Sequence, residues 1–531
     1  MRPASEKAGA RCGRELWPAD KVTGTIYDFA VNVASLLSAS AIRLPERAAW
    51  LCADTGSSYA ETAARVARLA GSLRHSGIGT GDRLVLVLPN GPELFELLWA
   101  CFWAGIVAVP LNRHLHPREV AFVVQHSGTA VLVLSEATSE AAGHLDASSR
   151  VICTESPGYL GLAAGEPLPI TAVSPDDPAW LFYTSGTTGR PKGATLTHRN
   201  LLSMTMNYYS DIDPLSGEAI FLHAAPLTHG SGLYLLPAVG HGATNVISGR
   251  DGFDPAEYLA LVGRHRVTHA AFLAPTMLRR ITDKASELGW QSPTLRSVVV
   301  GGAALYEQDL ADAQDVFGPI VGQMYGQGEA PMTIAVMPPA QLTARDDPAA
   351  NWRSCGRPFT GVEVRIGDPA RSGVNPGVQG DIFVRGDVVM AGYWNDQQAT
   401  AEALPSGWLK TGDIGYFDQH GFLYITDRSK DVIISGGSNV YPREVEEALL
   451  LHPGVREAAV IGVADPLWGE SVRAYVVTVP GRQPSAEELI AHCREHLASF
   501  KKPKHIVFVE ELPKSPTGKI LKRLLRAGLS A

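Results

Sequence analysis

An alternation of amphipathic and apolar segments constrains the fold of this chain more than any other feature of its sequence. Residues 61–77 carry apolar side chains at helical spacing, and residues 82–89 form a continuous apolar run that is typical of a strand. Residues 92–105 and 129–135 repeat this order. Strands that are apolar on both faces and separated by helices indicate a parallel sheet covered on both sides. We therefore expect an α/β fold with doubly wound, mostly parallel sheets.

The pattern changes after about residue 355. Short strands separated by Gly and Asp, within 361–368, 380–386, 421–428 and 430–437, predict an antiparallel β subdomain. From Tyr441 a compact α+β unit follows, and it closes with a basic amphipathic helix. A chain of 531 residues exceeds a single core. The expected parts are an N-terminal tail (1–20), a large domain (21–427) and a small C-terminal domain (428–531).

Charge, cysteine content and hydropathy exclude several classes of protein. The chain has 46 basic and 54 acidic residues, which argues against a nucleic-acid partner. Its six cysteines form no C-x-x-C pair, so a reducing cytoplasm is the expected location. The first 20 residues contain no apolar signal-peptide core. Residues 94–110 are interrupted by Glu96 and predict a buried helix that runs into a strand, not a membrane span.

The stretch YTSGTTGRPKGATLTH, residues 183–198, has the composition of a phosphate-binding loop. We expect it between a strand and a helix that begins near His198, where backbone N–H groups and hydroxyls can hold an anion. It is not a P-loop of kinases or GTPases, because Pro191 replaces the second glycine and Gly193 follows Lys192. A flexible Gly/Thr turn is the alternative interpretation.

This loop resembles the phosphate loop of the adenylate-forming superfamily, which includes the acyl-CoA synthetases. Further motifs match that family in the same order: GGAAL (301–305), YGQGE (325–329), WLKTGDIG (408–415), DRSKDVIISGG (427–437) and PKSPTGK (513–519). The resemblance implies a two-step reaction, in which a carboxylate attacks the α-phosphate of ATP to give acyl-AMP and pyrophosphate, and a thiol then displaces AMP. It implies ATP and CoA as substrates besides the carboxylic acid, and Mg²⁺ as the cofactor.

The resemblance also assigns roles to residues of this chain. Catalytic roles fall to Lys519, His229 and Glu329, and Mg²⁺ binding to Glu329 and Thr184. Nucleotide binding falls to Thr184, Ser185, Gly186, Thr187, Thr188, Gly189, Lys192, Gly302, Ala303, Ala304, Tyr325, Gly326, Gln327, Asp413 and Arg428. Judged without the family, Asp413 is a turn-capping residue and Lys519 one of several solvated basic residues on the terminal helix.

A mobile small domain is part of the same implication. It rotates about Lys430, and a tunnel for the CoA arm contains Ser435, Gly436 and Gly437. The expected acyl pocket contains His229, Gly230, Tyr234, Phe272 and Thr276. Since neither Lys nor Arg is among them, an apolar acyl or aryl group fits, and fatty and aromatic acids both stay open.

Three features leave alternatives. Gly328 stands where the family commonly has a Thr whose hydroxyl bonds the nucleotide phosphate. Gln327, Thr184 or Thr187 could supply this hydrogen bond instead. A stand-alone enzyme that loads a carrier protein and a non-catalytic acyl- or nucleotide-binding relative are the other functional hypotheses, and a homodimer is one open oligomeric state. HCREH, residues 492–496, matches a zinc-peptidase pattern, and we interpret it as chance.

Overall fold

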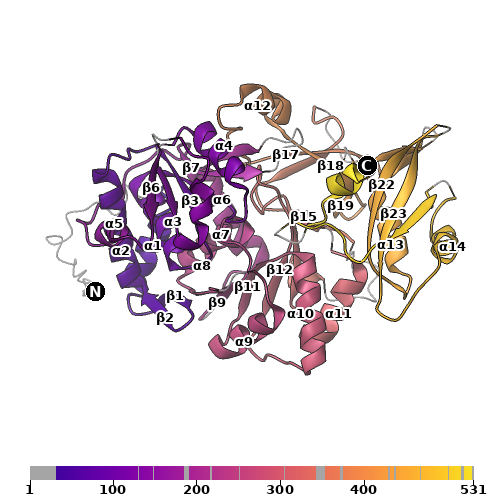
Figure 1. The fold of residues 1–531 in the computed structure, drawn as a ribbon, viewed down its shortest axis with the longest axis horizontal. Coiled ribbons are helices and arrows are strands. Elements are labelled where there is room, and N and C mark those ends of the chain that lie inside the picture. Colours follow the sequence, from indigo (N-terminus) through magenta and orange to yellow (C-terminus); the bar gives the residue numbers. More distant parts are fainter. Residues whose placement is uncertain are drawn as a thin grey trace, which may run out of the picture.

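The computed structural model describes most of the chain. The described residues are 31–129, 131–146, 149–184, 191–215, 218–249, 252–303, 305–342, 353–370, 375–428, 431–435, 438–466, 468–499, 501–515 and 519–528. The predicted N-terminal tail lies outside them. Residues from about 455 onward, drawn in orange to yellow in Figure 1, form much of the lobe at the end of the molecule opposite the N-terminus.

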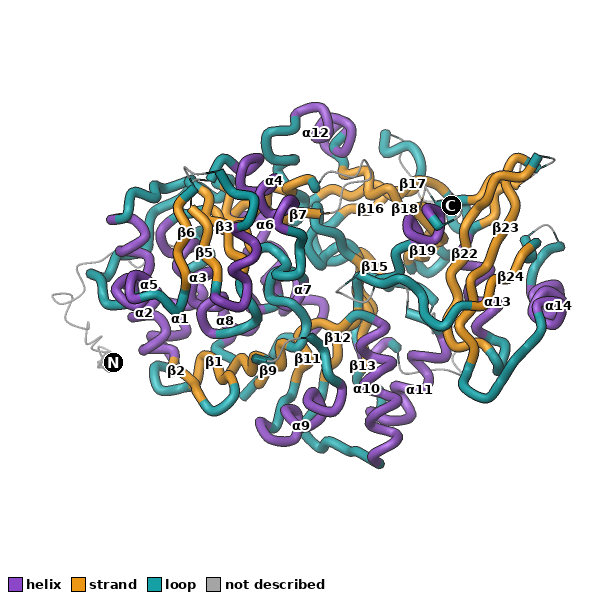
Figure 2. The backbone as a smooth tube through the Cα atoms, in the orientation of Figure 1, coloured by secondary structure: helices purple, strands orange, loops and turns teal. Residues whose placement is uncertain are grey.

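Two large sheets build the N-terminal part, and their strands are coloured orange in Figure 2. The nine-stranded sheet contains, in spatial order, β15 (Arg357–Pro358), β14 (Ala335–Met337), β13 (Val321–Tyr325), β12 (Ser297–Val300), β11 (His269–Leu273), β9 (Ile220–His223), β10 (Thr244–Ile247), β1 (Ala48–Cys52) and β2 (Thr55–Ser58). The six-stranded sheet contains β6 (Arg150–Cys153), β5 (Val131–Leu134), β3 (Arg83–Val87), β4 (Val107–Pro110), β7 (Pro178–Thr184) and β8 (Lys192–Thr197). Neighbouring strands are parallel except towards sheet edges, as between β7 and β8.

Two further sheets are formed by the C-terminal half of the chain. The first is antiparallel and contains β16 (Glu363–Ile366), β17 (Gly380–Arg385), β18 (Leu409–Phe417) and β19 (Leu423–Arg428). The second contains β21 (Ser438–Val440), β20 (Ile433–Ser435), β23 (Gly469–Thr478), β22 (Val455–Asp465) and β24 (His505–Phe508). The antiparallel β subdomain and the α+β unit are thus present, and the predicted fold class is confirmed.

Helices connect and cover these sheets (Figure 1). Those of the large part are α1 (Ser35–Arg43), α2 (Tyr59–His75), α3 (Pro92–Ala104), α4 (Pro117–Ser127), α5 (Pro157–Leu162), α6 (His198–Asn207), α7 (Gly230–Leu233), α8 (Leu235–His241), α9 (Pro255–His265), α10 (Pro275–Leu288), α11 (Glu307–Phe317) and α12 (Gln397–Ala403). The C-terminal part adds α13 (Pro442–Leu450), α14 (Ala486–His496) and α15 (Lys522–Ala527). Short 3-10 or π turns cover Glu136–Ala142, Tyr208–Ile212, Pro339–Gln341 and Pro405–Gly407.

One apolar core joins the two large sheets. It includes Leu84 of β3, Trp180 of β7 and Phe221 of β9, each with at most 1% of its surface exposed. Helix α3 is buried on all sides and leads into β4, as the apolar run predicted. Within the described residues, no helix is long and apolar enough to cross a bilayer.

Local structure differs from the sequence-based expectation at three motifs. The predicted phosphate loop is followed by strand β8, which begins at Lys192 and pairs antiparallel with β7, and the expected helix α6 then starts at His198 as predicted. Asp413 lies inside β18, not in a turn, because Gly412 (φ +75°) lets the strand continue through an irregular backbone position. Lys519 precedes α15, which begins at Lys522.

Candidate functional site

Three sheets meet where most of the described motif residues lie. Tyr325 ends β13 of the nine-stranded sheet and Thr184 ends β7 of the six-stranded sheet, while Asp413 belongs to β18. Hydrogen bonds between side chains connect these elements, from Tyr325 to Asp413 and from Thr184 to Glu329. Ligands of α/β proteins bind at the carboxyl ends of such strands. The junction is therefore the candidate active site.

The carboxylate of Asp413 is held by three side chains. Its Oδ2 atom accepts hydrogen bonds from the hydroxyl of Tyr325 (2.5 Å) and from Nε2 of Gln327 (2.7 Å). Its Oδ1 atom lies 2.7 Å from Nε of Arg428, which faces it across the β18–β19 pair. Burial and the neighbouring carboxylate raise the pKa of Tyr325, so its hydroxyl stays a donor. A carboxylate has about four acceptor positions, so this clamp fixes Asp413 and still leaves room for a ligand hydroxyl.

The carboxylate of Glu329 has two hydroxyl neighbours on one oxygen. Oε1 accepts hydrogen bonds from the hydroxyl of Tyr393 (2.8 Å) and from Oγ1 of Thr184 (3.3 Å). Carboxylate and hydroxyl oxygens are hard donors of the kind that Mg²⁺ prefers. The donor set of Glu329 and Thr184 therefore fits the magnesium ion that the sequence predicts here.

Tyr393 is a site residue that the sequence analysis missed. Besides its bond to Glu329, its ring lies 5.0 Å from Nζ of Lys192. The segment that carries it pairs with β8, through hydrogen bonds from Ala391 N to Thr195 O (3.0 Å) and from Trp394 N to Gly193 O (2.8 Å). In the sequence, Tyr393 was marked only by the aromatic pair at 393–394, which lies between a strand and a helix.

Gly328 lies where two side chains leave no room for a third. A Cβ atom on Gly328 would come within 2.6 Å of Cγ2 of Thr184 and within 2.7 Å of Cδ1 of Phe182. Two of the three residues expected to replace the missing threonine are otherwise engaged: Gln327 bonds Asp413 and the carbonyl of Thr411, and Thr184 bonds Glu329. The third, Thr187, lies outside the described residues. Phe182, which the sequence analysis did not single out, occupies the space instead.

The structure gathers most of the predicted acyl-pocket residues. Phe272 packs between two glycines, since a Cβ on Gly230 would meet its ring at 3.0 Å and one on Gly302 at 3.3 Å. The ring of Tyr234 lies edge-on to Phe272, with centroids 6.5 Å apart. The hydroxyl of Tyr234 is buried and finds no hydrogen-bond partner among the described residues. Thr276 lies in the first turn of α10 and is partly buried.

His229 borders this aromatic group. Burial lowers the pKa of His229 to about 4, so the imidazole is neutral at pH 7. Its Nδ1 atom lies 2.9 Å from Oγ1 of Thr228. Its ring lies edge-on to Phe182, with centroids 5.5 Å apart. The group around Phe272 thus presents aromatic and uncharged surfaces, as the sequence predicts.

The remaining predicted residues lie further from this junction or outside the described part. Gly302 and Ala303 are exposed directly after β12, and Gly326 packs against the backbone of Met332. Ser435 pairs with Ser438 and Gly469 in the C-terminal sheet. Outside the described residues lie Ser185, Gly186, Thr187, Thr188, Gly189, Ala304, Lys430, Gly436 and Gly437.

Lys519 is exposed, and its position relative to Glu329 is set by the orientation of the C-terminal lobe. Its backbone N–H donates to Oγ of Ser515 (3.1 Å), and its carbonyl accepts from the N–H of Ser515 (2.7 Å). Contacts between the lobes include a bond from Nη1 of Arg279 to the carbonyl of Arg456 (2.7 Å) and one from the hydroxyl of Tyr306 to Glu446 (3.4 Å).

Comparison with known proteins gives two matches to family models. Residues 37–394 match the AMP-binding enzyme family, and residues 444–519 match the AMP-binding enzyme C-terminal domain.

Individual relatives are similar over most of their length. A feruloyl-CoA synthase of Amycolatopsis is 40% identical over 477 residues, which cover 89% of this chain and 94% of the relative. A fatty acid–[acyl-carrier-protein] ligase of Streptomyces coeruleorubidus is 34% identical, with 91% and 93% covered. The structure of o-succinylbenzoate CoA synthetase from Bacillus subtilis, in complex with its acyl-adenylate intermediate, matches with a TM-score of 0.81 and 32% identity over 92% of this chain and 97% of that one.

Proposed function

Because the chain belongs to the AMP-binding enzyme family, we propose that it joins an aromatic carboxylic acid to CoA through an acyl-adenylate. AMP-forming acid–thiol ligation is the activity that the family and the named CoA ligases support. The observation that carries the proposal is the Asp413 clamp, which holds a buried carboxylate between Tyr325, Gln327 and Arg428.

The clamp binds the nucleoside end of ATP. The carboxylate, held by three donors, accepts a hydrogen bond from one ribose hydroxyl without reorganising, and Arg428 supplies a planar donor beside it for the oxygens of the same ribose. Glu329 and Thr184 hold Mg²⁺, which offsets the charge of the phosphates as a Lewis acid. Lys192, next to Tyr393, adds a cation at the start of β8.

Neutral side chains receive the acid. His229 carries no charge at pH 7, so it does not trap the carboxylate as an ion pair and leaves it able to attack the α-phosphate. Lys519 stabilises the charge that develops at this phosphate, once the C-terminal lobe brings it near. In the second half-reaction the same lobe places Ser435, with Gly436 and Gly437, beside the CoA arm.

The aromatic class of the acid rests on Phe272 and Tyr234. Two glycines bring the backbone close to the ring of Phe272, and the edge-on ring of Tyr234 continues this surface. The buried hydroxyl of Tyr234 requires a partner, which the para oxygen of a phenolic acid would supply. The feruloyl-CoA synthase among the relatives acts on an acid of this kind by its name.

A mass-spectrometric product screen tests the proposal. The full chain is incubated with ATP, Mg²⁺ and CoA, and with para-hydroxycinnamates, cinnamate, and medium- and long-chain fatty acids. We expect hydroxycinnamoyl-CoA and AMP as the main products. Tyr234→Phe is expected to reduce the preference for para-hydroxycinnamate over cinnamate about tenfold, the value of one buried hydrogen bond.

The other outcomes contradict separate parts of the proposal. Fatty acyl-CoA as the main product would exclude the aromatic class while retaining the ligase. Acyl-AMP that is not converted to acyl-CoA would exclude CoA as the acceptor. It would then favour a carrier protein, the acceptor named for the Streptomyces coeruleorubidus relative.

A further inference from the structure

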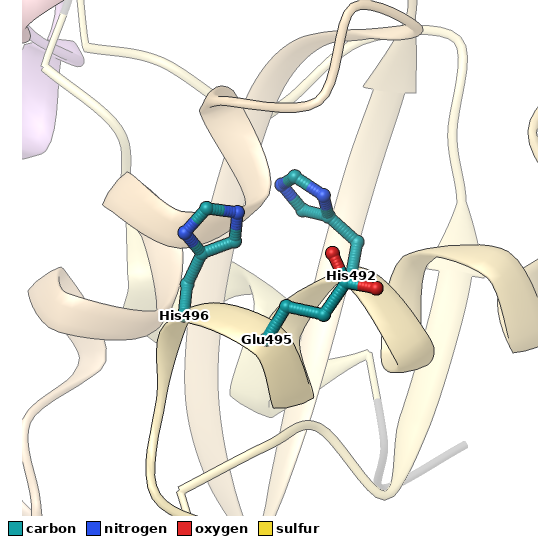
Figure 3. Close-up of side chains that lie close together, drawn as sticks. All are labelled: His492, Glu495 and His496. Carbon is teal, nitrogen blue, oxygen red and sulfur yellow. The ribbon is translucent and has the colours of Figure 1, made fainter.

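The last turn of α14 places three metal-ligating side chains together, far along the chain from the nucleotide site. His492, Glu495 and His496 each offer one ligand atom, and these atoms lie within 4.8 Å of one another. Figure 3 shows the three side chains on one short stretch of the helix, with both imidazole rings on the same side. Residues three and four apart share a helix face, which explains how so short a segment brings them together.

A backbone carbonyl selects the tautomer of His492. Its Nε2 atom lies 3.0 Å from the carbonyl oxygen of Ala448 in α13. A carbonyl can only accept, so Nε2 carries the hydrogen and Nδ1 keeps a free lone pair. Histidines that ligate metals characteristically donate their other N–H to a carbonyl or carboxylate in this way. The ring is thus oriented before any ion arrives.

Charge at this place also favours a cation. His496 is the last residue of α14, where the helix dipole attracts positive charge. His452 is not a ligand, because Nδ1 accepts from the N–H of Gly454 and Nε2 bonds Glu488.

We propose that His492, Glu495 and His496 form a binding site for a zinc-class divalent cation. Two imidazole nitrogens and one carboxylate oxygen suit Zn²⁺ and related first-row ions, whereas Mg²⁺ prefers oxygen donors throughout. In a tetrahedral site with bonds of about 2.0–2.1 Å, ligand atoms are about 3.3 Å apart, so the side chains must rotate inward. They are free to do so, since Glu495 and His496 are exposed. Water completes the coordination.

Such a site has a structural role. The ion would join side chains within the last turn of α14. Through the hydrogen bond from His492 to Ala448, it would also connect this turn to α13. A ligand that binds the folded state stabilises it by mass action. Zinc binding is therefore expected to stabilise the C-terminal lobe. The proposal is independent of the ligase activity.

Titration of the full chain with ZnCl₂ tests the site. After the protein is stripped with a chelator, isothermal calorimetry is expected to show one site with these ligands. His492→Ala and His496→Ala should each weaken the affinity of this site for Zn²⁺ by about tenfold or more. Loss of a residue that only hydrogen-bonds a metal ligand already lowers metal affinity about 10–100-fold. Glu495→Gln should weaken it less, since the amide oxygen can still ligate. His505→Ala is the matched control, because His505 is exposed in the same lobe at the start of β24.

Thermal unfolding supplies a second readout. Zn²⁺ is expected to raise the unfolding temperature of the wild-type and His505→Ala proteins, and to raise that of His496→Ala clearly less at the same Zn²⁺ concentration. His496 is exposed, so this variant should fold even if His492→Ala does not. Equal Zn²⁺ affinity in wild type and His496→Ala, or the absence of Zn²⁺ binding by the wild type, would overturn the proposal.

Discussion

At the residue scale, Gly328 shows how the packing adjusts to a departure from a family motif. In many relatives the motif at 325–329 is expected to carry a threonine, and here the space beside the glycine holds the ring edge of Phe182 and the methyl of Thr184. Thr184 keeps its hydroxyl on Glu329, and Phe182 keeps its edge-on contact with His229. Residue 328 therefore sets the positions of groups in both the metal-binding and the acid-binding parts of the site.

Gly328→Ala is predicted to impair adenylation. A Cβ at this position overlaps Thr184 and Phe182, and overpacking of this kind costs about 1–3 kcal/mol. The displaced Thr184 hydroxyl would leave Glu329, and we expect kcat/KM for ATP-dependent pyrophosphate release to fall about tenfold. Phe182→Ala/Gly328→Ala should recover part of the loss, because one of the two overlaps is removed.

The control is Gly263→Ala, since a Cβ on Gly263 meets nothing within 4 Å. It should release pyrophosphate at the wild-type rate. If Gly328→Ala and Gly263→Ala were equally active, the close packing around Gly328 would have no role in the site.

At the scale of elements, the pair α2–α3 contains a buried ion pair. Glu96 of α3 is 2% exposed, and its Oε2 atom lies 2.5 Å from Nε of Arg65 on α2. Burial raises the pKa of Glu96 to about 7, and the guanidinium of Arg65 opposes this shift. A capping box of Ser58 and Glu61 fixes the start of α2 and hence the register of Arg65. The otherwise apolar helix α3 thus depends on one partner for its single buried charge.

Arg65→Ala is predicted to destabilise the protein more at pH 8 than at pH 5. Without its partner, Glu96 has a folded pKa still further above its unfolded value, so folding takes up a proton and stability rises as the pH falls towards that unfolded value. At pH 8 the folded variant must either keep Glu96 protonated against the solvent or bury an unpaired charge, a loss of up to about 3–5 kcal/mol, whereas at pH 5 Glu96 is largely protonated with or without Arg65. Urea unfolding midpoints at the two pH values measure the difference.

Arg199→Ala provides the comparison, because Arg199 and Asp176 form an exposed pair. Its removal should cost about 1 kcal/mol or less at either pH. An equal loss for Arg65→Ala at pH 5 and pH 8 would show that Glu96 does not change protonation in this range.

At the scale of the whole molecule, hydrogen bonds among the described residues hold the C-terminal lobe against the large part, including those from Arg443 to Asp427 and to the carbonyl of Ile425. Arg279 and Tyr306 of the large part bond Arg456 and Glu446 of the lobe. Within the lobe, Arg526 of α15 lies 2.7 Å from Asp431, directly after the predicted hinge. The segment that carries Lys519 is thus tied to the hinge region, so rotation there would carry this lysine with it.

Lys519→Ala is predicted to separate the two half-reactions. Formation of acyl-AMP, measured by pyrophosphate release, should be abolished, because the cation that stabilises charge at the α-phosphate is lost. Transfer of a supplied acyl-AMP to CoA should be largely retained. Lys502→Ala, whose Nζ atom donates to the carbonyl of Ser499 in the same lobe, is the control and should retain both. Equal loss of both half-reactions in Lys519→Ala would contradict a division of labour between lobe orientations.

Much of the architecture was predictable from the sequence because it depends on local patterns. Apolar runs marked β3, β11 and β12, and helical spacing marked α2 and α3. The motifs named Asp413, Arg428, Gln327 and Glu329 before any contact was known. The position of Lys192 in a strand was not predictable, because it depends on the antiparallel pairing of β8 with β7. The domain boundaries and the roles of residues outside the described part stay predictions.

By itself, the sequence determined the fold class, the family and the chemistry of individual side chains, since periodicity and motif composition are properties of neighbouring residues. Only the tertiary structure decided which side chains meet. Tyr325 reaches Asp413 across 88 residues, Tyr393 reaches Glu329 across 64, and Thr184 reaches Glu329 across 145. The contact of Phe182 with Gly328 and the hydrogen bond from His492 to the carbonyl of Ala448 also join segments that are distant in the sequence. Contacts between distant segments follow from the packing of whole sheets and helices, which no local pattern specifies.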